Sequence, residues 1–201
     1  MRATELIPLA SWLAQRGRCR HCGGAIGIDH PLAELAGAAI GVIAILLLPW
    51  PAAAVLALVG WWLLALALID LWTTRLPDPL TLPLVLAGIA AAALGLAPVG
   101  VVEAALGATT GFVVFAAIGW LWRRCRGVDG LGLGDAKLLA AAGAWVGPAA
   151  LAWVVLAGGT LGIVHALLAG HRLDSRVPIP FGPALAAGFW LVLAVRLVTA
   201  A

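Results

Sequence analysis

Gly130-Leu131-Gly132-Leu133-Gly134-Asp135-Ala136-Lys137 is a glycine-rich turn ending in a carboxylate, where a polar, basic segment gives way to a long apolar run. The glycines at 132 and 134 carry no side chain, so another backbone has room to approach this turn. Asp135 is either a functional carboxylate at a helix entrance or a cap on the following helix. Lys137 is either a cation that marks the end of the loop or a charge that acts on a nearby aspartate.

The composition points to a lipid environment. Of 201 residues, 64% are hydrophobic and 10% are charged, and the mean hydropathy is +1.10. A soluble domain of this length cannot bury so much apolar surface, so we expect an all-α, polytopic membrane helix bundle. The formal charge of +3 does not indicate a nucleic-acid partner, because the basic residues lie in short loops between apolar runs and not on one basic face.

Seven apolar runs predict seven transmembrane helices. Asp78 is expected to be the N-cap of the third helix, with Pro79 at its first position. The fifth run is short for a hydrocarbon core of ~30 Å, so a six-span bundle is the alternative. The expected helices cover residues 31–49, 52–69, 79–97, 101–122, 135–146, 149–170 and 181–198.

The charges of alternate loops predict the orientation. One set of connections (residues 1–30, 71–78, 123–137 and 171–180) holds 11 of the 12 lysines and arginines, and the other set holds none. The positive-inside rule makes the basic side cytoplasmic, with the N-terminus on that side. Arg196 is the exception and can extend to the far surface. We expect residues 1–30 to be a cytoplasmic segment and residues 31–201 to be the transmembrane domain.

The N-terminal segment contains one cysteine knuckle. Cys19 and Cys22 are separated by two residues and followed by Gly23 and Gly24, which let the chain fold back around a metal. This pair supplies half of a zinc site, so the two thiols are either metal ligands, zinc being the expected ion, or a reduced pair without metal.

Two aspartates are expected at the same depth. Asp70 ends an apolar run and Asp135 begins another, both on the predicted cytoplasmic side. A carboxylate in an apolar run is costly and suggests function. Two carboxylates in a dry site are expected to share one proton, so that one can deprotonate water while the other protonates a scissile carbonyl. The alternative is a proton-coupled carrier in which Asp70 and Asp135 relay protons.

His165 lies inside the sixth apolar run, near its cytoplasmic end. A polar ring at this depth either hydrogen-bonds to a neighbouring helix or helps to position a substrate.

Four segments, in order along the chain, resemble the type IV prepilin peptidases, a family of GxGD aspartic membrane proteases. The segment Arg18-Cys19-Arg20-His21-Cys22-Gly23, together with the stretch from Pro31 to Leu35, is similar to the start of the family's membrane core. Ile69-Asp70 with the stretch from Arg75 to Pro83 looks like the first aspartate motif, and the stretch from Gly132 to Leu139 looks like the GxGD motif. Ile179-Pro180-Phe181-Gly182-Pro183 resembles the loop before the last helix.

The resemblance implies an aspartic endopeptidase of the bacterial inner membrane that needs no cofactor for peptide cleavage. Asp70 and Asp135 would be the catalytic residues, and Gly132, Gly134 and Lys137 would lie where the substrate backbone approaches. The implied substrates are prepilins or pseudopilins of type IV pilus and type II secretion systems, whose basic leader is removed on the cytoplasmic side. The resemblance also implies that the protein is surrounded by membrane lipid.

The chain departs from the long members of this family at its N-terminus. Those members carry a further N-terminal helix and two Cys-x-x-Cys pairs associated with zinc, and many also methylate the new N-terminus. Here only the pair that looks like the second is present. We therefore expect either a peptidase-only form or a part of a longer protein, and S-adenosylmethionine is a cofactor only if methyltransferase activity is retained.

Overall fold

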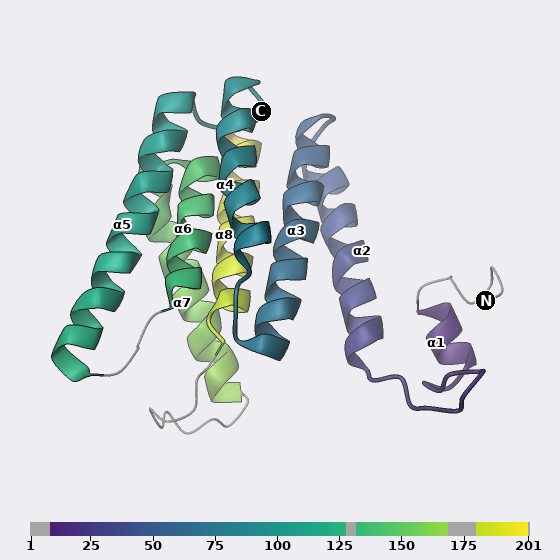
Figure 1. Cartoon of the computed structure of the whole chain (residues 1–201). Coiled ribbons are helices and arrows are strands. Elements are labelled where there is room, and N and C mark those ends of the chain that lie inside the picture. The colour runs from purple at the N-terminus through teal and green to yellow at the C-terminus, as the bar shows by residue number, and fades with distance from the viewer. Residues whose placement is uncertain (1–8, 128–131, 169–179, 201) are drawn as a thin grey trace.

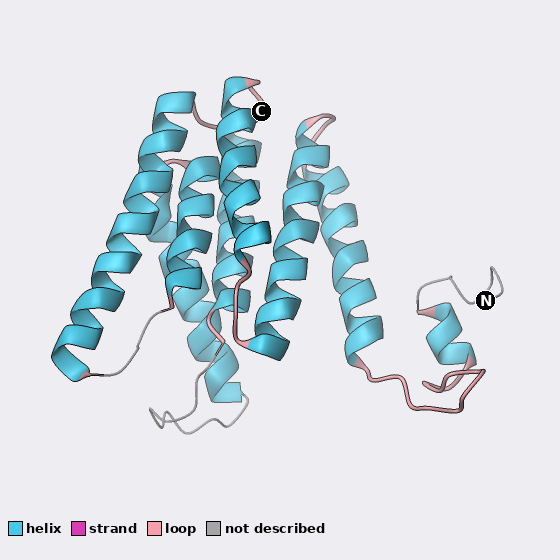
Figure 2. Ribbon diagram, viewed as in Figure 1, coloured by secondary structure: helices cyan, strands magenta, loops and turns pink. Residues whose placement is uncertain are grey.

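A computed structural model describes residues 9–127, 132–168 and 180–200, and over these ranges the chain forms helices joined by loops, without a strand (Figure 2). Every apolar run predicted to be a helix forms one, and a short helix lies ahead of them. The elements are α1 (Ala10–Ala14), α2 (Asp29–Leu47), α3 (Ala52–Thr73), α4 (Asp78–Ala93), α5 (Val101–Arg126), α6 (Leu133–Val146), the 3₁₀ turn η2 (Pro148–Ala150), α7 (Leu151–Leu168) and α8 (Gly182–Ala200).

Five of these segments are long and apolar enough to cross a membrane: α2, α3, α5, α8, and η2 continued by α7. The all-α, polytopic membrane bundle expected from the composition is therefore confirmed. α4 has 16 residues and α6 has 14. At a rise of ~1.5 Å per residue both are shorter than a hydrocarbon core of ~30 Å, so they are the segments on which the number of spans depends.

Several helix ends differ from the expectation: α2 covers Asp29–Leu47 and not 31–49, and α5 continues to Arg126 and not 122. The ends of α4 and α3 matter most for the site. α4 ends at Ala93 and not at residue 97, because Gly95 adopts a left-handed φ of +69° that closes the helix. α3 continues past the expected end at residue 69 as far as Thr73, because Leu71 and Trp72 continue the helical run. Asp70 consequently lies inside the last turn of α3 and not after it.

The shortest of the apolar helices, α6, is the centre of the bundle. Its residues 138–146 are all buried, and it packs against α4, α5 and α8 (Figure 1). The backbones of α5 and α6 come very close at Gly107 and Gly143, where a Cβ on either glycine would overlap the carbonyl group of the other. This close approach fixes the position of α6, and with it the position of Asp135.

One end of the bundle collects the segments that the sequence singled out. In Figure 1 the α3–α4 connection, the N-termini of α6 and α8 and the basic C-terminal end of α5 lie at this end, and the C-terminus of the chain lies at the other. α8 packs against α3, α6 and α7, and so joins the helix that carries Asp70 to the helix that carries Asp135.

Candidate active site

Asp70 is held at the N-terminus of α8. Its side chain lies in the last turn of α3 and is only 6% exposed. The backbone N–H of Gly182, the first residue of α8, donates a hydrogen bond of 3.1 Å to Asp70 Oδ2. A helix N-terminus offers unpaired N–H groups and a partial positive charge, both of which suit a carboxylate. This contact fixes the orientation of the Asp70 carboxylate.

Gly182 has room for no side chain. A Cβ at this position would lie 2.5 Å from Asp70 Oδ2 and 2.9 Å from its Cγ. Reasoning from the sequence assigned no role to Gly182, although it noted the segment Ile179-Pro180-Phe181-Gly182-Pro183. The sequence feature that could have indicated this role is Gly182 directly before Pro183. A proline marks the first turn of a helix, and a glycine beside it leaves room for an anionic group at the helix N-terminus.

Asp135 lies in the first turn of α6 and is half-buried. The charge of Asp70 acts on its carboxylate, so each group when ionised repels the other. The structure thus brings the two sequence-predicted aspartates to one end of the bundle, where the charge of one acts on the other, although they lie 65 positions apart in the chain. Each carboxylate therefore influences the ionisation of the other, and the sharing of one proton between them stays a prediction.

The two glycines of the GxGD turn have different neighbours. A Cβ on Gly134 would lie 3.0 Å from Leu76 Cβ, so the segment between Asp70 and α4 packs directly against this glycine. A Cβ on Gly132 would lie 3.5 Å from Asp135 Oδ2. The space beside Gly132 therefore faces the Asp135 carboxylate, and residues 130 and 131 of the turn lie outside the described residues.

Lys137 forms an ion pair with Asp78, with 2.5 Å between Nζ and Oδ1. The expectation that Asp78 is an N-cap is wrong: Pro77 is the cap residue, Asp78 is the first residue of α4, and no side chain caps this helix. Pro77 is the extended residue before the helix, with φ −73° and ψ 132°, so α4 begins at Asp78, one residue earlier than expected. The freed carboxylate pairs with Lys137, and the pair ties the N-terminus of α4 to the first turns of α6.

The cysteine knuckle forms as a tight turn. The N–H of Cys19 donates to Gly24 O, the N–H of Gly23 donates to Cys19 O, each at 2.8 Å, and Gly23 has a left-handed φ of +69°. The described ranges contain no group of three or more histidine, cysteine or acidic side chains that could hold a metal. Since structural zinc takes four ligands, Cys19 and Cys22 supply half of a site here, and zinc binding stays a prediction.

Two family models match this chain. Residues 56–167 match the type IV leader peptidase family, and residues 1–48 match the bacterial peptidase A24 N-terminal domain. The comparison with solved structures found no match.

Several relatives named prepilin leader peptidase/N-methyltransferase align over nearly all of the chain. The protein of Burkholderia pseudomallei is 45% identical over 192 residues, which cover 94% of this chain and 62% of that protein. The protein of Aeromonas hydrophila is 44% identical, covering 95% of this chain and 67% of that protein. The protein of Pseudomonas aeruginosa is 41% identical, covering 96% and 67%.

The chain thus spans about three fifths of the length of the Burkholderia relative, since the alignment covers 62% of that protein. Its membrane-length helices and its relatives make it a multi-pass bacterial membrane protein. The match over residues 56–167 includes both aspartates, Asp70 on α3 and Asp135 on α6. On this evidence the chain belongs to the type IV leader peptidase family.

Proposed function

We propose that this protein is a membrane aspartic endopeptidase that removes the basic leader of a prepilin or pseudopilin. The single observation that carries the proposal is the juxtaposition of Asp70 and Asp135 at one end of the bundle, one of them on the N-terminus of α8. The printed names of the relatives, which describe prepilin leader peptidases, agree with this chemistry.

The proposed reaction uses water and the two carboxyl groups. One carboxylate removes a proton from water, which attacks the scissile carbonyl, while the protonated partner donates its proton to the carbonyl oxygen. The tetrahedral intermediate then collapses, and a proton passes to the leaving amine as the two carboxyl groups exchange roles. The Gly182 N–H keeps one carboxylate in a fixed orientation during these transfers.

This peptide cleavage requires no cofactor. Zinc at Cys19 and Cys22 would have a structural role in the N-terminal segment, outside the proton transfers. S-adenosylmethionine enters only if the chain also methylates the new N-terminus. Mass spectrometry of the cleaved product, with and without S-adenosylmethionine, separates a peptidase from a bifunctional enzyme.

We place the active site at the cytoplasmic face of the bacterial inner membrane, with the N-terminus of the chain on the same side. Basic residues at this end of the bundle support that orientation: Arg75 follows α3, three arginines lie in the last turn of α5, and Lys137 lies near the start of α6. The cytoplasmic N-terminal segment (residues 1–30) and the transmembrane domain (residues 31–201) follow as proposed divisions of the chain.

The position of the carboxylates also argues against the carrier alternative. Relay carboxylates of carriers lie near the membrane midplane, whereas Asp70 is in the last turn of α3 and Asp135 is in the first turn of α6. The comparisons do not favour a carrier either.

Purified protein in vesicles, given a membrane-anchored substrate with a basic leader, separates the two functions. We expect the leader to be cleaved without proton transport across the vesicle membrane. Proton transport without leader cleavage would contradict the proposal.

A further inference from the structure

An apolar groove of about 680 Å³ opens beside Asp70. Leu71, the next residue after Asp70, lines it, and so do Phe181 and Pro183, which flank Gly182. These three residues are chain neighbours of the two partners of the Asp70–Gly182 hydrogen bond, so the groove lies next to the candidate active site.

The groove runs from the active-site end into the bundle. Along α8 its lining extends from Pro183 to Ala187, which at ~1.5 Å per residue is about 6 Å of helix. On the opposite wall α7 contributes Leu161 and His165. A chain lying in the groove would therefore start at the level of Asp70 and continue toward the membrane interior.

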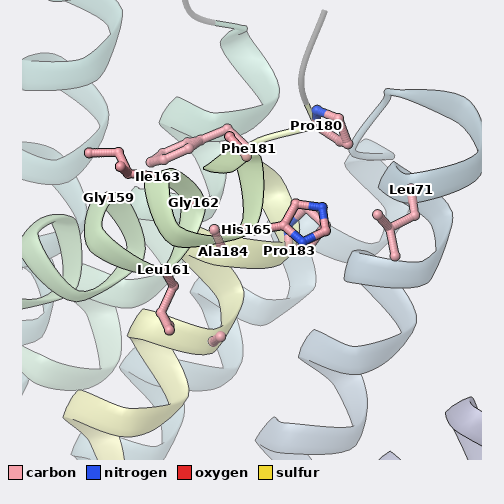
Figure 3. A pocket seen from close by; sticks show the side chains of 12 residues that line it. Leu71, Gly159, Leu161, Gly162, Ile163, His165, Pro180, Phe181, Pro183 and Ala184 are labelled. Atoms are coloured by element: carbon pink, nitrogen blue, oxygen red, sulfur yellow. The ribbon is translucent and has the colours of Figure 1, made fainter. Parts of the chain in front are cut away.

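His165 carries the one polar side chain among the described residues that line this groove. In Figure 3 its imidazole points toward the side of the groove where Leu71 of α3 lies. Within the described ranges it has no hydrogen-bond partner. His165 is exposed in the last turn of α7, so its imidazole is accessible to a chain that lies in the groove and can exchange hydrogen bonds with it.

We propose that this groove holds the substrate residues that directly follow the scissile bond, and that His165 hydrogen-bonds to their backbone. The inference rests on the proposed function. A helix must unwind around a peptide bond before that bond can be hydrolysed. The N–H and C=O groups on either side of the bond then need hydrogen-bond partners in apolar surroundings. The basic leader is unsuited to apolar walls, so the segment on the other side of the bond enters the groove.

Kinetics of His165 variants test the contact. With a synthetic membrane substrate that has a basic leader followed by an apolar segment, we expect His165→Ala to raise KM about fivefold, the value of one neutral hydrogen bond. The kcat should stay within about twofold, because the imidazole does not take part in the proton transfers. His165→Gln should restore most of the affinity, since an amide also donates and accepts. Val164→Ala, an exposed neighbour outside the groove, is the control.

Filling the groove tests its occupant. Ala187 is exposed on the groove wall, so Ala187→Phe adds bulk without a packing conflict and should raise KM strongly. Val195→Phe, at an exposed position further along α8, should leave cleavage unchanged. A photoreactive residue at position 187, in an Asp135→Asn background that prevents turnover, should crosslink to the substrate residues after the scissile bond.

The outcomes separate this inference from the proposed function. An unchanged KM in both His165→Ala and Ala187→Phe, or crosslinks only to lipid or to the leader, would overturn the groove inference even while the wild type cleaves. Crosslinks to the segment after the bond, with no cleavage by the wild type, would support the groove and contradict the proposed peptidase chemistry.

Discussion

The N–H of Gly182 donates a hydrogen bond of 3.1 Å to Asp70 Oδ2, joining the last turn of α3 to the first residue of α8. The two residues lie 112 positions apart in the chain. The contact has two consequences: it fixes one of the two candidate catalytic carboxylates, and it leaves no space for a side chain at position 182.

Gly182→Ala should therefore impair cleavage. Its Cβ would lie 2.5 Å from Asp70 Oδ2, so the carboxylate must move or the start of α8 must shift. We expect kcat/KM to fall by about tenfold or more, because small displacements of reacting groups are costly. Gly100→Ala is the control, since Gly100 lies at the start of another helix, as the cap residue of α5, and its Cβ would meet nothing within 4 Å. Full activity of Gly182→Ala would refute this role.

The Lys137–Asp78 ion pair should contribute modestly to the position of Asp135. The two side chains are 25% and 54% exposed, so a coupling of about 0.2–1 kcal/mol is expected. Lys137→Ala and Asp78→Ala should each lower cleavage slightly, and the double variant should do little further harm. Purely additive effects in this double-mutant cycle would show that the pair does not act as a unit.

Gly143→Ala should destabilise the bundle. A Cβ at position 143 would overlap the carbonyl of Gly107, so α5 and α6 would have to separate. Over-packing of this kind costs about 1–3 kcal/mol, which thermal unfolding in detergent can detect. The control is Gly37→Ala in α2, where the added methyl meets only Leu64 Cδ2, at 3.8 Å. Equal thermal stability of the two variants would contradict the tight α5–α6 contact.

Cleavage should survive Cys19→Ser and Cys22→Ser, because neither thiol takes part in the proposed proton transfers. Metal analysis of the purified wild type and of both variants should accompany the assay. Loss of cleavage in a folded Cys variant would mean that the N-terminal segment takes a direct part in the reaction.

Much of the fold could be predicted from the sequence because its signals are local. An apolar run long enough for a membrane predicts a helix wherever it occurs, and a carboxylate placed at the edge of such a run is conspicuous, as Asp70 and Asp135 are. The end of α4 was misplaced because the apolar run continues past Gly95, whereas the left-handed glycine ends the helix.

The partners of these residues could not be predicted, because they depend on which helices are neighbours. Nothing near Asp70 in sequence indicates that its oxygen meets Gly182, and nothing near Asp78 indicates that it pairs with Lys137 and does not cap α4. Both contacts arise from packing between helices, where α8 lies against α3 and α4 lies against α6.

Leader cleavage by Asp70→Asn and Asp135→Asn at equal expression, beside Asp29→Asn, tests whether the two aspartates are the catalytic pair. Asp29 is an exposed carboxylate in the first turn of α2 and serves as the control. Asparagine keeps the shape of the side chain but cannot exchange the proton, so each site variant should lose at least about a hundredfold in rate while the control keeps full activity. Cleavage that persists at the wild-type rate in either site variant would contradict the aspartate pair as the catalytic centre.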